Sequence, residues 1–151
     1  MAKGKNNTPI TKKVKTDMAV DRSPLKPMNP RQKQYINAIN TSGVVICIGV
    51  LGSSKTYIPA VMAADQLLAG TIQHVVIARP AEGAGKSVGF FKGDKDEKLS
   101  GWCEPVTGTL RKRLGPTAYL AMLDSGKIEL LALEQCKGRN FDYTFLIVDE
   151  A

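Results

Sequence analysis

The residues best suited to chemistry begin with a glycine-rich stretch, GVLGSSKT, at positions 49–56. A phosphate-binding loop needs backbone N–H groups that point at anionic oxygens, a lysine for the β- and γ-phosphates, and a hydroxyl for Mg²⁺. The matching residue types stand at the required positions: Gly49, Gly52, Lys55 and Thr56. The stretch therefore predicts a nucleotide-binding loop at the start of a helix. The alternative is a Gly/Ser turn in which the lysine is accidental.

One position of this loop departs from the usual pattern. Where the motif has a second glycine before the lysine, the sequence has Ser54, which follows Ser53. A Cβ at that place is expected to crowd the contact between backbone and phosphate. The loops of MCM-type and MoxR-type ATPases resemble this one in carrying a small alanine there. We therefore count Ser53 and Ser54 among the nucleotide-binding residues and expect a partial defect.

Two adjacent carboxylates, Asp149 and Glu150, follow an apolar run at 145–148. In an α/β sheet, ligands bind at the carboxyl ends of the strands. Asp149 is expected to hold Mg²⁺ through water, and Glu150 to orient or deprotonate the attacking water. The pair favours an ATPase over a kinase of small molecules, and the absence of an N-K-x-D signature disfavours GTP. The alternative is a solvated strand end.

A sheet and its helices must position these residues. The apolar periodicity and the turn signals predict helices at 30–39, 57–68, 106–114 and 118–123 and strands at 44–48, 74–78, 128–133 and 144–148. Asn29 and Pro30 are good residues for a helix start. The unbroken run at 44–48 is typical of a strand buried on both faces. Strands alternating with helices predict an α/β fold with a mainly parallel sheet. The Gly- and Lys-rich region 81–101 is expected to be a long surface segment.

Composition bounds the class of protein. The chain has 151 residues, of which 43% are apolar and 23% charged, so we expect one domain with a packed core. Three cysteines without metal-ligand spacing and a single histidine disfavour a disulfide framework, a cysteine zinc site and a multi-histidine metal centre. No run approaches the roughly 18 apolar residues that cross a bilayer, and the N-terminus is no secretory signal. We expect a cytoplasmic protein without membrane contact.

The basic character belongs mainly to the N-terminus. The net charge is +7, and residues 1–27 hold seven basic and two acidic residues. Such a lysine-rich, apolar-poor stretch predicts a disordered arm, with residues 28–151 forming the ATP-binding domain. The functional alternative is weak, salt-sensitive contact with a nucleic-acid backbone. Either way, we expect folding to be independent of residues 1–25.

Four segments, taken in order, resemble the PhoH-like family of P-loop ATPases, particularly its short phage-encoded members. They are MNPRQKQYI (28–36), IGVLGSSKTYIPAVMAAD (48–65), VVIARPAEGAGKSVGFFKGDKDEKLSGW (75–102) and GKIELLALEQCKGRNFDYTFLIVDEA (126–151). The RPA, GFF-x-G-D, KGR and DEA pieces together are more diagnostic than the loop alone. The resemblance covers the chain after about residue 25. It implies a P-loop NTPase three-layer sandwich, with ATP and Mg²⁺ as cofactors.

The resemblance also implies roles for residues outside the two motifs. Gln32 would read the adenine edge, unless it only caps its helix. Arg79 and Arg139 would contact a nucleic-acid phosphate or act as an arginine finger on a neighbouring subunit. For both arginines, a plain salt bridge is the alternative. RNA or single-stranded DNA, a homo-oligomeric ring, and the host cytoplasm for a phage-encoded member are further implications of the family.

The sequence ends directly after the D-E pair, whereas the family continues into a stretch that begins with Q-N and supplies a further strand. That strand would lie between 44–48 and 145–148. We therefore expect a fold that lacks its C-terminal strands, in which these two runs are either unpaired or pair directly.

Two functions remain open at this point. The first is a Mg²⁺-dependent ATPase that acts on nucleic acid, with Lys55 and Glu150 as catalytic residues and with weak or no turnover by this chain alone. The second is a nucleic-acid-binding or assembly module with a degenerate, non-hydrolysing nucleotide site. Ser54 and the lysine-rich tail favour the second; the intact Lys55–Thr56 and Asp149–Glu150 pairs favour the first.

Overall fold

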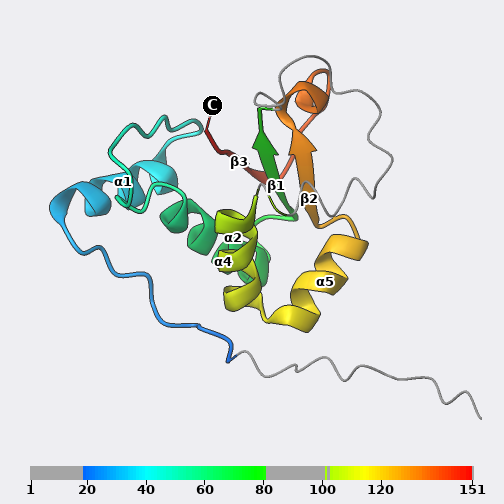
Figure 1. Cartoon of the computed structure of the whole chain (residues 1–151), viewed down its shortest axis with the longest axis horizontal. Helices are drawn as coiled ribbons and strands as arrows, with labels where there is room; N and C mark the ends of the chain where they lie inside the picture. The colour runs from blue at the N-terminus through cyan, green and yellow to red at the C-terminus, as the bar shows by residue number, and fades with distance from the viewer. Residues whose placement is uncertain (1–18, 81–100, 102, 151) are drawn as a thin grey trace, which may run out of the picture.

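A computed structural model describes residues 19–80, 101 and 103–150 (Figure 1). Its elements in chain order are α1 Pro30–Thr41, α2 Tyr57–Ala69, β1 His74–Arg79, α4 Glu104–Leu114, α5 Pro116–Asp124, β2 Ile128–Ala132, the short 3-10 helix η1 Leu133–Cys136, and β3 Thr144–Val148. The strands form one parallel sheet in the order β2-β1-β3. The predicted α/β class and parallel sheet are confirmed. Apart from Gly101, the surface segment predicted at 81–101 lies outside the described residues.

Local signals account for the helix boundaries. The side chain of Asn29 accepts a hydrogen bond from the backbone N–H of Gln32 at 2.9 Å, and Pro30 occupies the first turn of α1. Helix α2 ends at Gly70, whose φ of 71° is a left-handed conformation that glycine adopts at little cost. Both helices lie within about two residues of the predicted ranges.

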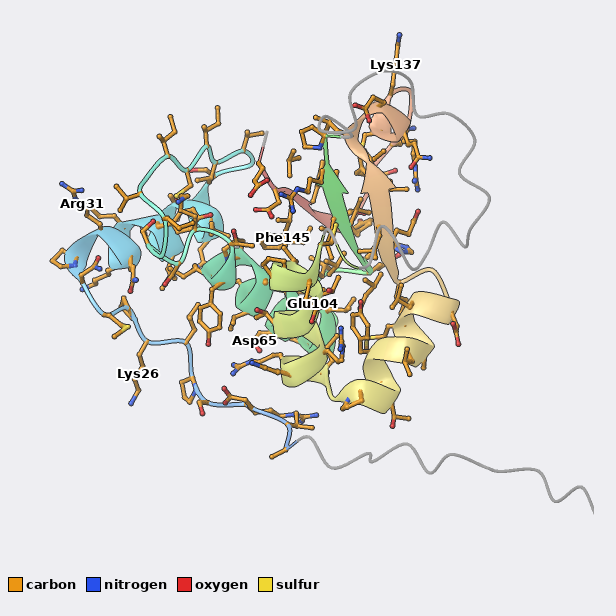
Figure 2. All side chains as sticks on the ribbon, viewed as in Figure 1. Lys26, Arg31, Asp65, Glu104, Lys137 and Phe145 are labelled. Carbon is orange, nitrogen blue, oxygen red and sulfur yellow. The ribbon has the colours of Figure 1, made fainter. Side chains whose placement is uncertain are left out.

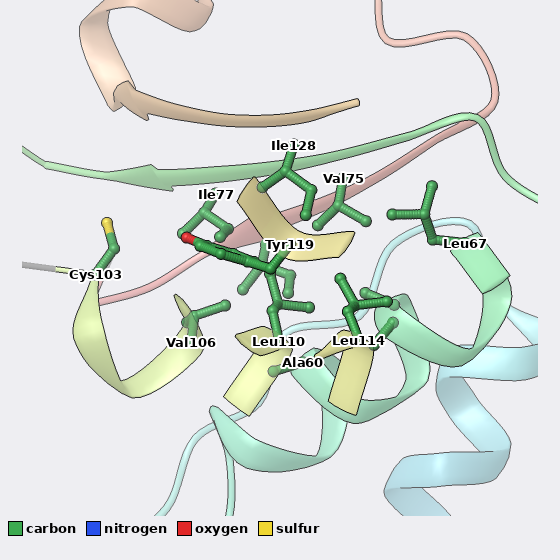
Figure 3. Close-up of a cluster of buried hydrophobic side chains, with 13 residues drawn as sticks. Ala60, Leu67, Val75, Ile77, Cys103, Val106, Leu110, Leu114, Tyr119 and Ile128 are labelled. Carbon is green, nitrogen blue, oxygen red and sulfur yellow. The ribbon is translucent and has the colours of Figure 1, made fainter. Parts of the chain in front are cut away.

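The core lies between one face of the sheet and the helices α2, α4 and α5, while α1 lies beyond α2 (Figures 1 and 3). On β1, Val75 and Ile77 point into this core and are fully buried. Complete burial of an isoleucine side chain contributes about 2 kcal/mol. The buried members of the cluster are Ala60, Ala63, Ala64, Leu67, Val75, Ile77, Cys103, Val106, Leu110, Leu114, Tyr119, Ile128 and Ile147. The central strand is therefore held by packing as well as by two hydrogen-bonded ladders.

The predicted strand at 44–48 is wrong. These residues form no strand in the structure, and Val44, Ile46 and Ile48 are 84%, 84% and 93% exposed. The run does not pair with β3, and no other described strand lies beside it. β-branched side chains favour a strand only where a neighbouring strand supplies hydrogen bonds and buried contacts. Of the two arrangements expected for 44–48 and 145–148, the structure has the unpaired one.

A buried arginine joins the N-terminal segment to the helices. Arg113 of α4 donates to both carboxylate oxygens of Asp65 on α2, at 2.7 and 2.8 Å. It also donates to the backbone carbonyls of Asp21 and Ser23. Asp65 lies on the side of α2 that faces the N-terminal segment (Figure 2). Part of the predicted tail therefore contacts α4, whereas residues 1–18 lie outside the described residues.

Among the helices in the described parts of the chain, none is long and apolar enough to cross a membrane.

Replacing Arg113 with methionine should lower the free energy of unfolding by about 2 kcal/mol. The side chain of Arg113 is only 8% exposed, so its loss leaves two carbonyls and a carboxylate without their donor. Asp65 is 43% exposed and recovers part of this cost from water. Urea unfolding measures the change. The matched control is Arg111→Met on the same helix, which breaks an exposed pair with Glu104 and should cost less than about 0.5 kcal/mol. Equal losses in the two variants would contradict this role.

Deletion of residues 1–18 should leave stability unchanged, whereas deletion of 1–25 should lower it by about 1 to 2 kcal/mol. The longer deletion removes the carbonyls of Asp21 and Ser23 that accept from buried Arg113. The sequence alone predicts that folding is independent of residues 1–25. The contacts of Asp21 and Ser23 with Arg113 instead predict a loss of stability for the longer deletion. Thermal unfolding of the two truncated chains measures the difference. An unaffected 26–151 chain would mean that water replaces both acceptors without cost.

Candidate functional site: the loop 49–56 and the carboxyl end of the sheet

The loop 49–56 meets the end of β3. The chain between α1 and α2 passes the carboxyl end of this strand (Figure 1). There the hydroxyl of Thr56 donates to Oδ1 of Asp149 at 3.0 Å. The two residues are 93 positions apart in the sequence. The structure thus brings together the predicted loop and Asp149, the first of the two predicted carboxylates.

Lys55 is enclosed by its own loop. Its ammonium donates to the carbonyls of Gly49 at 2.8 Å and Val50 at 2.7 Å, and it lies 3.4 Å from the hydroxyl of Ser53. A side chain at Gly49 would put a Cβ at 3.3 Å from that hydroxyl, so glycine fits this close approach best. A phosphate bound in the loop would take the place of these carbonyls around the ammonium.

Ser54 occupies a glycine conformation. Its φ is 65° and that of Gly52 is 76°, both in the left-handed region. Residues with a Cβ adopt this region at a cost of about 1 kcal/mol. The structure therefore locates a backbone cost at Ser54. The predicted crowding of phosphate by its Cβ stays a prediction.

Helix α1 holds the other side of the loop. Tyr35 donates from its hydroxyl to the carbonyl of Lys55 at 3.1 Å. Partial burial, with a smaller contribution from Cys47, raises the pKa of Tyr35 to about 12, further above the neutral pH at which a tyrosine hydroxyl is already protonated. The sequence analysis missed this anchor. The signal was the position of Tyr35 one turn after the helix start, three residues beyond Gln32.

Gln32 combines two roles. Its side-chain oxygen accepts from the backbone N–H of Met28 at 2.7 Å, which stabilises the helix start. Its amide nitrogen reaches the hydroxyl of Ser54 at 3.5 Å. The residue is therefore more than a cap, because it also contacts the loop. Its predicted contact with adenine stays a prediction.

The second carboxylate pairs with an arginine at the end of β1. The backbone N–H of Asp149 donates to the carbonyl of Ala78 at 2.9 Å, which continues the ladder between β1 and β3. Glu150 has a φ of 55°, and its carboxylate pairs with the guanidinium of Arg79. The two predicted carboxylates thus contact different partners, Asp149 the loop and Glu150 the end of β1.

Arg139 lies on the other side of the sheet's central strand. It donates to both oxygens of Glu129 on β2, at 3.1 and 2.9 Å, and its guanidinium lies 5.5 Å from the ring centre of Phe141. Figure 2 shows Lys137 at the tip of the turn after β2, far from Arg31 on α1. Of the interpretations considered for Arg139, a phosphate contact, an arginine finger or a salt bridge, the structure shows the salt bridge.

The oxygen donors at this site suit a hard cation. Asp149 offers a carboxylate and Thr56 a hydroxyl, and Mg²⁺ takes such ligands, commonly one or two from protein and the rest from water and phosphates. No group of three or more His, Cys, Asp or Glu side chains that could hold a metal occurs among the residues described. The donor set thus fits an ion that needs nucleotide phosphates to complete its coordination.

The family model of the PhoH-like proteins matches residues 24–151. A PhoH-like protein of Synechocystis sp. is 37% identical over 121 residues, which are 80% of this chain and 37% of that protein. A PhoH-like protein of Bacillus subtilis is 35% identical over 120 residues, 80% of this chain and 38% of that protein. Protein PhoH of Escherichia coli is 32% identical over 133 residues, 87% of this chain and 38% of that protein. The chain thus spans less than two fifths of the length of these relatives.

Replacing Ser54 with glycine should raise the free energy of unfolding by about 0.5 to 1 kcal/mol, because glycine adopts the left-handed conformation without a Cβ penalty. Ser54→Ala is the control, since alanine keeps the Cβ and loses only the hydroxyl. It should give no gain. Urea unfolding measures both. If the glycine variant is instead less stable than the parent, the contact between Ser54 and Gln32 outweighs the backbone cost.

Proposed function

Because the chain belongs to the PhoH-like protein family, we propose that its loop 49–56 binds ATP together with Mg²⁺ and that Glu150 supports hydrolysis. The family membership confirms the resemblance found in the sequence and indicates a function of the P-loop NTPase kind. ATP as the nucleotide, and hydrolysis as the reaction, are the finer parts of the proposal.

A single contact carries this proposal. Thr56 donates to Asp149 at 3.0 Å, so the residue after the loop lysine touches the first carboxylate beyond a parallel strand. A P-loop site needs these two oxygens side by side, because both act on the same metal ion. An accidental Gly/Ser turn would have no reason to lie within hydrogen-bond distance of Asp149.

Each residue has a defined part in this function. Lys55 would exchange the carbonyls of Gly49 and Val50 for phosphate oxygens, which bind an ammonium more strongly because they carry charge. Thr56 and Asp149 would hold Mg²⁺, which when bound neutralises charge on the phosphates. Glu150 would orient or deprotonate water once its carboxylate leaves Arg79. Gln32, already in contact with the loop, is the proposed adenine contact.

The family expectations of RNA or single-stranded DNA as partner, of a ring-shaped oligomer and of a cytoplasmic location stay predictions. The rival function, a nucleic-acid-binding or assembly module with a degenerate nucleotide site, draws support from the left-handed Ser54. Against it, Arg139 is paired with Glu129 instead of being presented to a backbone phosphate. The two functions differ in what removal of the loop lysine does to nucleotide affinity.

Lys55→Ala should weaken binding of Mg²⁺-ATP at least tenfold, or about 1.4 kcal/mol, because it removes the ammonium that the triphosphate needs. Isothermal calorimetry measures the affinity. The matched control is Lys112→Ala on α4, which removes the same charge from an exposed helix position and should leave affinity unchanged.

Hydrolysis is tested separately with Glu150→Gln. This variant should bind ATP at least as tightly as the unaltered chain and lose turnover, measured as release of inorganic phosphate. The proposed nucleotide site is refuted if Lys55→Ala binds ATP as tightly as the unaltered chain, or if neither chain binds ATP. Either result would favour the nucleic-acid-binding or assembly module.

A further inference from the structure

Arg79 and Glu150 meet because two neighbouring strands end together. Arg79 is the last residue of β1, and Ala78 lies opposite Val148 in the parallel register of β1 and β3. The hydrogen bond from the N–H of Asp149 to the carbonyl of Ala78 extends this register by one residue. Glu150 therefore emerges next to Arg79 at the carboxyl end of the sheet, the end that the loop 49–56 also reaches.

Glu150 is the more exposed partner of this ion pair, and its backbone is strained. Its φ of 55° is in the left-handed region, where a residue with a Cβ is held only by its surroundings. The side chain of Glu150 is 68% exposed, whereas that of Arg79 is 25% exposed. The guanidinium is thus the more buried of the two charged groups.

The chain brings Arg79 and the first carboxylate to the same place. Asp149 precedes Glu150, the partner of Arg79, and its backbone N–H donates to Ala78, the residue before Arg79. Asp149 in turn contacts Thr56. Arg79 is therefore a cation at the same end of the sheet as the carboxylate that would hold the proposed metal.

We propose that Arg79 is a positioning residue that binds the γ-phosphate of its own chain's nucleotide and, in doing so, releases Glu150. This rests on the proposed function. A guanidinium binds a carboxylate or a phosphate through the same N–H groups, and the terminal phosphate carries more negative charge than a carboxylate. ATP supplies this competitor and ADP does not. Without a γ-phosphate, Glu150 stays bound to Arg79 and cannot act on water.

The first test compares ATP and ADP affinities, each with Mg²⁺, for the full chain and for Arg79→Gln. The variant should reduce the preference for ATP over ADP about tenfold, because one charge-assisted contact to the γ-phosphate is lost. Its ADP affinity should stay within about twofold of the parent. Arg79→Lys should recover part of the preference. Arg111→Gln is the matched control, since Arg111 pairs with Glu104 on α4 and should not alter either affinity.

The second test uses the competition itself. Glu150→Gln removes the carboxylate charge that competes with the γ-phosphate for the guanidinium, and it should tighten ATP binding about threefold without changing ADP binding. In the Arg79→Gln background the same change should have no effect on either nucleotide. An arginine with a merely structural role would not produce this coupling, because it would alter both affinities together.

Failure of the inference and failure of the proposed function give different results. If the unaltered chain binds neither nucleotide, the proposed function falls and this inference falls with it. If the chain binds both but without preference for ATP, or if Arg79→Gln changes ATP and ADP affinity equally, only the role of Arg79 is overturned. If Glu150→Gln weakens ATP binding, the two groups do not compete and the inference is likewise overturned.

Discussion

The parallel ladder between β1 and β3 is the constraint on which the site depends. It places Asp149 and Glu150 beside the end of β1, and the hydrogen bond from Asp149 to Ala78 fixes their position along that strand. β1 itself is held in place because Val75 and Ile77 are fully buried against the helices and because β2 pairs with its other edge. Helix α2, packed on the same face, then brings Thr56 to Asp149. Packing of the core thus determines the geometry of the polar groups.

The polar groups of the site satisfy one another within the protein. Lys55 is bound by its own loop, Thr56 by Asp149, and Glu150 by Arg79. A ligand must replace these contacts, so its net binding free energy is the difference between two sets of hydrogen bonds and not the sum of the new set. A triphosphate and Mg²⁺ suit such an exchange. The phosphates would replace the neutral carbonyls around Lys55 by charged oxygens, and Mg²⁺ would replace the hydroxyl of Thr56 as the partner of Asp149.

The sequence predicted the elements whose signals are local. Asn29, Pro30 and Gly70 act within one turn of the backbone, and both helices they delimit were confirmed. The strand at 44–48 failed because burial of a β-branched run depends on strands that its own residues do not specify. The motifs predicted that Lys55, Thr56 and Asp149 belong to one site. They did not predict the contact of Tyr35 with the loop or the ion pair of Arg79 with Glu150, because these depend on tertiary packing. Those partners come from the packing of α1 and the register of β1 with β3.

The two sides of the site differ in how firmly they are held. Asp149 continues a ladder of the buried sheet, whereas the loop and the segment before it expose most of their apolar side chains, with Val44 at 84%, Ile48 at 93% and Leu51 at 100% exposure. Helix α1, which contacts the loop through Tyr35 and Gln32, has no buried residue of its own. Few buried contacts mean a low free energy for local opening. Opening of the loop would therefore compete with nucleotide binding, and on the side of α1 only the contacts of Tyr35 and Gln32 among the described hydrogen bonds oppose it.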